Sequence, residues 1–153
     1  MIESDQRFTP PHVLDVVREF DRIALDPCTT RDNPVGASLF YTEAQDGLAR
    51  QWCGLAFWNC PYSRGQTVRW AKRAHEAWEH DRIESIGLVI ADTSTQAVQY
   101  LLEHANAVAF WKRRIRFAGD ASAKFANMLP YFGERQGRFK RVFEPHATVL
   151  VLR

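Results

Sequence analysis

Short apolar runs that alternate with amphipathic stretches place the strongest constraint on how this chain folds. The clearest run, residues 85–91, is apolar almost throughout, which is typical of a strand buried on both faces of a sheet. Residues 66–80 before it and residues 95–104 after it carry apolar side chains at helical spacing. Because such a strand is buried only when helices cover both faces of its sheet, the pattern predicts an α/β fold.

The same alternation extends over most of the chain. Helices are predicted at residues 11–20, 66–80 and 95–104, strands at residues 22–26, 54–59, 85–91 and 107–111, and a polar loop at residues 28–38. Further short strands are predicted at residues 114–117, 128–132, 138–143 and 148–152, between glycine-containing turns. We therefore expect a mostly parallel central sheet with antiparallel C-terminal strands at one edge.

Length and charge limit the classes of function. At 153 residues the chain is expected to form a single domain, residues 1–153. Its 20 Lys and Arg against 18 Asp and Glu leave a net charge of +2, so a polyanionic partner has to be held by a local patch. The first residues lack the basic and apolar regions of a signal peptide, and no apolar run approaches the roughly 20 residues that span a bilayer. We expect a cytoplasmic protein with no membrane partner.

The cysteines and histidines show no metal-binding pattern. Cys28, Cys53 and Cys60 form no paired CxxC motif, and the five histidines show no HExxH spacing. No metal site is therefore predicted. An odd number of cysteines in a cytoplasmic chain is typical of reduced thiols, so we expect no disulfide.

The segment Asn59-Cys60-Pro61-Tyr62-Ser63 is the strongest functional signal. It follows the predicted strand at residues 54–59, and in open α/β sheets ligands bind beyond the carboxyl ends of the strands. Asn-X-Pro-Tyr alone is also a common loop composition, so an ordinary loop with a packed tyrosine is the alternative interpretation.

In this setting the segment resembles the motif of amino-methyltransferases that use S-adenosylmethionine, which is Asp or Asn, Pro, Pro, then Tyr or Phe. The chain is similar to the phage-type, Dam-like DNA adenine-N6 methyltransferase family through segments in the same order, Phe8-Thr9-Pro10, Leu25-Asp26-Pro27-Cys28, Asp46-Gly47-Leu48, Trp52, residues 57–63, 114–117 and 131–133, Arg138-Phe139 and Val142-Phe143. The resemblance implies a Rossmann-like methyltransferase fold and methyl transfer to N6 of adenine in DNA.

The resemblance also assigns catalytic roles to Asn59, Cys60, Pro61 and Tyr62. The Asn59 side-chain oxygen and the Cys60 carbonyl would accept the two N–H groups of the adenine amine as positive charge develops on its nitrogen. Pro61 would hold the turn, and Tyr62 would stack on a base extruded from the duplex. Most family members carry proline where this chain has Cys60, so the carbonyl is kept but the fixed φ of proline is lost.

Binding residues are assigned in the same way. Cofactor contacts are expected from Phe8, Thr9, Pro10, Asp26, Pro27, Asp46 and Asn59. The alternative interpretations are that Asp26 caps its turn, that Thr9-Pro10 only starts a helix, and that Asp46-Gly47 is a plain turn. DNA phosphates would contact Arg64, Lys112, Arg113, Arg114, Arg116, Arg138, Lys140 and Arg141. Basic residues on exposed strand edges also prevent edge pairing, which is the other interpretation.

Two alternatives to adenine methylation stay open. A degenerate family member would bind nucleic acid or cofactor without catalysis, with Cys60 as the mark of a decayed motif. An active enzyme could instead methylate cytosine N4 or RNA, because the same acceptors suit any exocyclic amine. The resemblance also suggests a bacterial host cell, with a phage or prophage gene as the source.

Overall fold

A mixed sheet of eight strands is the centre of the computed structural model, which describes residues 8–117, 120 and 122–153. Its strands are β1 (Leu25–Thr29), β2 (Leu39–Thr42), β3 (Ala56–Trp58), β4 (Ser85–Gly87), β5 (Val89–Ile90), β6 (Ala107–Trp111), β7 (Asn127–Phe132) and β8 (Ala147–Val151). The helices are α1 (Pro11–Phe20), α2 (Gln66–Asp81), α3 (Gln96–His104), α4 (Gln136–Phe143) and the short 3-10 helix η2 (Glu43–Gln45).

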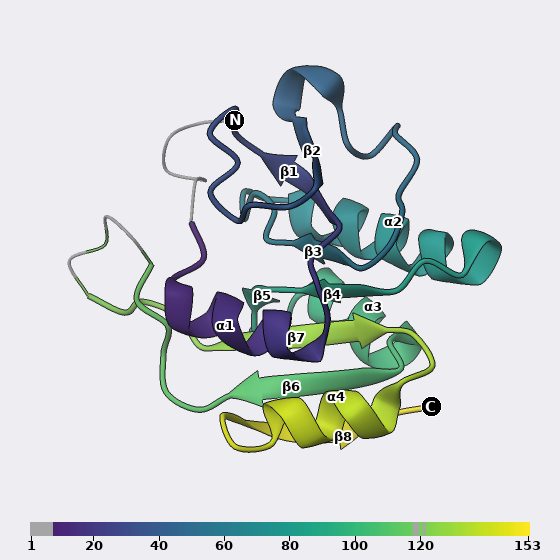
Figure 1. Cartoon of the computed structure of the whole chain (residues 1–153). Helices are drawn as coiled ribbons and strands as arrows, with labels where there is room; N and C mark the ends of the chain where they lie inside the picture. The colour runs from purple at the N-terminus through teal and green to yellow at the C-terminus, as the bar shows by residue number, and fades with distance from the viewer. Residues whose placement is uncertain (1–7, 118–119, 121) are drawn as a thin grey trace.

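Helices cover both faces of this sheet. Helices α1 and α4 pack on one face, and α2 and α3 pack on the other (Figure 1). Strand β3 shows why the sequence produces two cores, because its side chains alternate between the faces. Phe57 belongs to the core beneath α1 and α4, whereas Ala56 and Trp58 belong to the core beneath α2 and α3. All three are fully buried, as the apolar run predicts.

The strand order is β2-β1-β3-β4-β7-β6-β8, with β5 also paired to β7. Strands β2, β1, β3 and β4 are mutually parallel. Strand β7 is antiparallel to β4, β5 and β6, and β8 is antiparallel to β6. The expected parallel sheet is therefore confirmed for the N-terminal half, but antiparallel pairing takes up the whole C-terminal half rather than one edge.

Helical periodicity predicts the first three helices correctly. Helix α1 spans the predicted residues, and α2 and α3 differ from prediction by one residue at one end. The prediction of a strand at residues 138–143 is wrong, because this segment is part of α4. Phe139 and Phe143 lie four residues apart and are both fully buried, which is the spacing of one helical face. Residues 114–117 form neither helix nor strand.

The sheet differs from the sequence prediction at three places near the carboxyl ends of the parallel strands. Strand β1 begins later than expected and continues through Pro27 to Thr29, with an irregular register against β2. Strand β2 is not predicted at all, because its residues are half-buried or exposed. The predicted strand at residues 85–91 is divided at Leu88, whose backbone N–H donates to the carbonyl of Trp58 at 2.9 Å.

Candidate functional site

The Asn59-Cys60-Pro61-Tyr62 segment leaves the sheet at the carboxyl end of β3, as the sequence predicts. Asn59 is half-buried, and its amide contacts two side chains among the described residues. Its Nδ2 donates to the Thr9 hydroxyl at 2.9 Å, and its Oδ1 accepts from the Tyr62 hydroxyl at 2.9 Å. The Tyr62 hydroxyl also lies 3.4 Å from the carbonyl oxygen of Leu88. The candidate amine acceptor is therefore held in one orientation.

The contact from Thr9 brings the segment Phe8-Thr9-Pro10 to the motif across fifty positions of sequence. Pro10 also starts α1, since its carbonyl accepts from the backbone N–H groups of Val13 and Leu14. Phe8 is 38% exposed. Thr9 thus connects the beginning of α1 to the loop after β3. A residue that only started a helix would not need this contact.

A disulfide joins Cys28 to Cys60, so the expectation of reduced thiols is wrong. The two residues lie at the carboxyl ends of the neighbouring strands β1 and β3, and their Cα atoms are 5.6 Å apart. Disulfides commonly form at such a separation. Parallel pairing of the strands produces this proximity, which spacing along the sequence does not reveal. Cys53 is exposed and free, and it accounts for the odd number.

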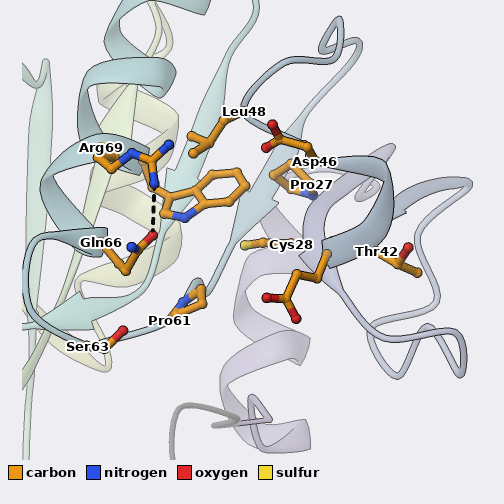
Figure 2. A pocket seen from close by; sticks show the side chains of 12 residues that line it. Pro27, Cys28, Thr42, Asp46, Leu48, Pro61, Ser63, Gln66 and Arg69 are labelled. Carbon is orange, nitrogen blue, oxygen red and sulfur yellow. Dashed lines mark hydrogen bonds between the residues drawn. The ribbon is translucent and has the colours of Figure 1, made fainter. Parts of the chain in front are cut away.

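A cavity of about 460 Å³ opens on the β1 side of the motif (Figure 2). It is lined by Pro27, Cys28, Thr42, Glu43, Asp46, Gly47, Leu48, Pro61, Ser63, Gln66, Arg69 and Trp70. Pro27, Asp46 and Pro61 are among the residues predicted to contact the cofactor or the reacting groups, and all three line this cavity. The volume lies within the ordinary range for small-molecule sites.

Gly47 explains why Asp46 reaches this cavity. A Cβ added at Gly47 would lie 1.8 Å from the carbonyl oxygen of Pro27, so only glycine permits this approach of the loop to β1. Asp46 itself adopts a left-handed φ of 56° at the end of η2. The Asp-Gly pair is thus required by the close packing of the loop against β1.

Glu43 lines the same cavity and was missed in the sequence. It follows β2 directly, in η2, and it lines the cavity together with Asp46. An acidic residue directly after a strand would have indicated a site residue. Glu43 could not be identified in this way, because Leu39–Thr42 was not predicted as a strand. The cavity therefore combines two carboxylates with apolar surface from Leu48 and Trp70.

Asp26 lies apart from this group of lining residues. Its side chain is only 4% exposed, and Oδ1 accepts from the backbone N–H of Cys28 at 3.3 Å. Burial raises the pKa of the Asp26 carboxyl to about 7 from an ordinary 3.8, while hydrogen bonds from Cys28 and Thr29 act to lower it. Asp26 therefore accepts from the backbone of its own strand, since β1 continues to Thr29.

A second cavity, of about 560 Å³, opens on the other side of the motif. It is lined by Tyr62, Ser63, Arg64, Gly65, Thr67, Val68, Ile90, Asp92, Thr95, Gln96, Ala97 and Phe125. Ser63 also lines the first cavity, so the loop after β3 is a shared wall. Phe117 meets the Tyr62 ring edge to face, with centroids 6.3 Å apart.

The basic segment Lys112–Arg116 follows β6 and leads directly to this tyrosine. Its members Lys112, Arg113, Arg114 and Arg116 are exposed. Ile115 and Phe117 are buried and fix the segment against the core that contains α1. Because Phe117 contacts Tyr62, the exposed cations lie on a segment anchored at the motif. Arg64 lines the second cavity.

The basic residues of α4 lie differently. Arg138 donates to the carbonyl oxygens of Phe20 and Glu19, at 2.8 and 3.0 Å, and so caps the end of α1. Lys140 and Arg141 are exposed on the same helix. The two basic segments predicted from the sequence thus differ in their contacts, because Arg138 is bound to backbone carbonyls of α1.

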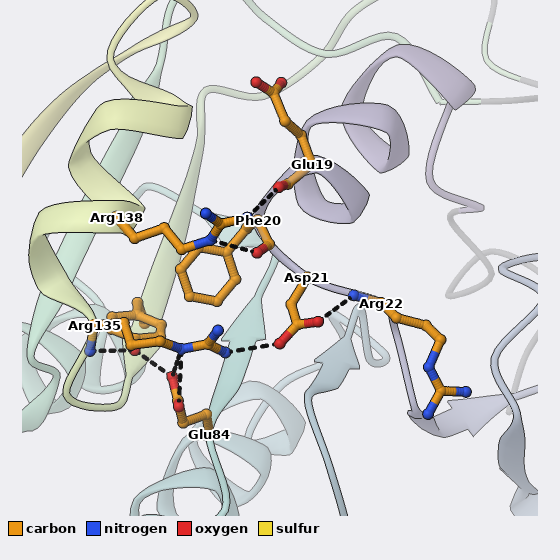
Figure 3. A network of polar contacts seen from close by, with 8 residues as sticks. Glu19, Phe20, Asp21, Arg22, Glu84, Arg135 and Arg138 are labelled. Atoms are coloured by element: carbon orange, nitrogen blue, oxygen red, sulfur yellow. Dashed lines mark hydrogen bonds and ion pairs between the residues drawn. The ribbon is translucent and has the colours of Figure 1, made fainter.

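A polar network surrounds the first turn of α4, where the parallel strands begin (Figure 3). Arg135 pairs with Asp21 at 2.9 Å and with Glu84 at 3.1 Å. The Tyr131 hydroxyl donates to Glu84 and accepts from the backbone N–H of Arg135. These groups connect the end of α1, the start of β4 and the turn before α4.

Over the described residues no group of three or more His, Cys, Asp or Glu is placed to hold a metal ion. Within the same residues, none of the helices is both long and apolar enough to cross a membrane. No curated protein matches the chain. Residues 2–129 match the family described as DNA N-6-adenine-methyltransferase (Dam), a range that includes the motif, both cavities and the Lys112–Arg116 segment. The chain therefore belongs to the Dam family of DNA N-6-adenine-methyltransferases.

Proposed function

We propose that this protein transfers a methyl group from S-adenosylmethionine to N6 of adenine in DNA, on a Rossmann-like methyltransferase fold. One observation carries the proposal: the loop Asn59–Ser63 separates two cavities, each of a size that suits a small molecule or a nucleobase. Methyl transfer needs the cofactor and the base to bind in neighbouring sites, because the two reacting atoms have to come close to each other.

The residues of the first cavity fit the cofactor. Glu43 and Asp46 offer carboxylates that can accept from ribose hydroxyls, and Pro27, Leu48 and Trp70 offer apolar surface for an adenine ring. When bound, S-adenosylmethionine supplies an electrophilic methyl group on a sulfonium. Thr9 holds the Asn59 amide, and through it the segment at Phe8 and Pro10 is tied to the same site.

The chain's own part in the reaction is to orient and polarise the amine. An amide oxygen has two lone pairs, so Asn59 Oδ1 can keep the Tyr62 hydroxyl bond and accept an adenine N–H as well. The Cys60 carbonyl accepts the second N–H, and Pro61 holds the turn. The Tyr62 ring, which lines the second cavity, provides the stacking surface for the extruded base.

DNA would approach over the exposed cations beside this cavity. Arg64, Lys112, Arg113, Arg114 and Arg116 are assigned to phosphate contact, since their segments border Tyr62. Lys140 and Arg141 are assigned a secondary role on α4. Arg138 already binds two backbone carbonyls, so a phosphate would have to compete with the end of α1.

The test is to incubate the purified full-length chain with tritiated S-adenosylmethionine and unmethylated duplex DNA. We expect label in N6-methyladenine and a loss on the order of 100-fold in kcat for Asn59→Ala. Asn59→Asp keeps the oxygen acceptors and should retain more of the rate. Label in N4-methylcytosine or in RNA would assign another substrate, and cofactor binding without label would identify a non-catalytic member.

A further inference from the structure

The disulfide between Cys28 and Cys60 lies within the reaction site. Cys60 stands between Asn59 and Pro61, and its side chain is 5% exposed. Cys28 belongs to β1, which pairs on one side with β2 and on the other with β3. The bond therefore ties the catalytic loop to an inner strand of the parallel half of the sheet.

The direction of the Cys60 carbonyl depends on the backbone dihedrals at that residue. Asn59 and Tyr62 are held by side-chain hydrogen bonds. Cysteine itself has no ring to restrict φ, in contrast to proline. Strand β3 ends at Trp58, so residue 60 lies outside the regular ladder. A covalent link to Cys28 limits the loop at the residue whose carbonyl has to point at the amine.

We propose that Cys28 is a positioning residue for this site, and that its bond to Cys60 is a redox-dependent clamp on the catalytic loop. The proposal rests on the proposed function. In the oxidised protein the clamp holds the Cys60 carbonyl for the amine, and the enzyme is fast. In the reduced protein the loop is freer and turnover is slower, while DNA binding is little changed.

The first cavity gives a reductant access to this bond. Cys28 is half-buried and lines the cavity, whereas Cys60 is buried. The thiolate of a small dithiol attacks Sγ of Cys28 and forms a mixed disulfide, and Cys60 leaves as a thiolate and takes up a proton. The second thiol of the reagent then releases Cys28. One dithiol supplies two electrons and two protons, which yields two cysteine thiols and the cyclic disulfide of the reagent.

The first measurement is chemical and needs no activity. Non-reducing trypsin digestion of the air-oxidised full chain should yield residues 23–31 linked to residues 51–64, with fragmentation that places the bond at Cys60 rather than Cys53. Hydrogen exchange of residues 59–65 should be slower in the oxidised protein than after dithiothreitol treatment. Absence of the linked peptide, or equal exchange in both forms, overturns the proposal.

The second measurement is kinetic. Dithiothreitol should lower kcat by on the order of 10-fold with little change in the KM for DNA, because a small displacement of a reacting group carries a cost of this size or larger. Oxidised glutathione should restore the rate. Cys28→Ser should be slow with or without reductant, and the matched control Cys53→Ser should behave as the unmodified chain does.

The decisive variant combines Cys28→Ser with Cys60→Pro. A proline ring restricts residue 60 without a disulfide, so this double variant should recover most of the rate and lose its response to dithiothreitol. A rate as low as that of Cys28→Ser, or an unmodified chain whose kcat ignores cleavage of the bond, overturns the clamp. If every form, the double variant included, leaves DNA unlabelled, the proposed function fails, and hydrogen exchange alone decides the clamp.

Discussion

The two ends of the parallel strands use polar side chains in opposite ways. At the amino ends, Arg135 pairs with Asp21 and Glu84, and its guanidinium also lies 4.6 Å from the ring centroid of Phe20. At the carboxyl ends, polar residues such as Glu43 and Ser63 line cavities. Charged side chains at the amino ends thus connect elements of the fold, whereas polar residues at the carboxyl ends lie where a ligand can enter.

The pKa values of Asp21 and Asp26 differ in the same way between the two ends of the strands. Partial burial acts to raise the pKa of Asp21, but hydrogen bonds from Arg135 and Arg22 and the charges of Arg135 and Arg138 together lower it. The pKa of Asp26 is raised to about 7, because burial outweighs its hydrogen bonds. At the amino ends of the strands, the Asp21 carboxylate is therefore paired with a cation. Asp26 in β1 accepts hydrogen bonds, but within the described part of the chain no cation contributes to its pKa.

The largest effect that distinguishes the two ends of the parallel strands is expected at Tyr62, at the carboxyl ends. Tyr62→Ala should lower kcat/KM by on the order of 100-fold, since it removes a stacking surface and a contact that orients Asn59. Tyr62→Phe keeps the ring and should lose roughly 10-fold, as expected for one hydrogen bond. Steady-state kinetics on an unmethylated duplex measure both. Equal losses in the two variants would contradict the stacking role.

Asp26 should give the next largest effect, as a pH dependence of stability. Between 3.8 and about 7 the folded protein keeps a proton that the unfolded chain has released. Rising pH in this window should therefore lower the free energy of unfolding, by up to about 1.4 kcal/mol per pH unit.

Asp26→Asn should remove that slope. Chemical denaturation of both proteins from pH 5 to pH 8 provides the measurement, with Asp15→Asn on the exposed face of α1 as the control. A slope that persists in Asp26→Asn would assign the titration to another group.

Arg135→Ala should act on stability alone. The variant leaves Asp21 and Glu84 without their cation, which should cost about 1–2 kcal/mol of unfolding free energy after allowance for partial exposure. Because the network lies at the amino ends of the strands, kcat at a temperature where the variant is folded should not change. A fall in kcat without unfolding would show that the two ends are coupled.

The smallest expected effect is a difference in DNA binding between variants of the two basic segments. Arg114→Gln should weaken DNA binding a few-fold and reduce the slope of log K against log salt by about 1, as the loss of one phosphate contact does. Arg138→Gln should leave that slope nearly unchanged and lower the melting temperature, since Arg138 caps α1. Fluorescence anisotropy at several salt concentrations distinguishes the two outcomes.

Most of the fold could be predicted from the sequence because its elements have one clear periodicity. The apolar face of α2 and the buried run of β6 each point to a single structure. Helix α4 could not, because its eight residues include Gly137 and carry only two buried aromatics. Strand β2 lacks a buried pattern altogether, and Glu43 was missed with it.

The site could be predicted only as far as local sequence defines it. Asn59 and Tyr62 are predicted as site residues from a motif at the end of a strand, and the structure shows that their side chains contact each other. The disulfide and both cavities depend on which strands become neighbours, and the order of Cys28, Cys53 and Cys60 along the chain does not contain that information. Arg138 shows the same limit, since a cation in a basic run gives no sign of the carbonyls it will meet.

Ser63 has a consequence for the way the two cavities are filled. The loop that ends at Ser63 belongs to both, so a molecule that shifts it from one side alters the shape available on the other. Thermodynamic reciprocity then requires that whatever factor the first occupant imposes on the affinity of the second is imposed in return. Because one loop forms a wall of both cavities, binding in one cavity and binding in the other are expected to be coupled.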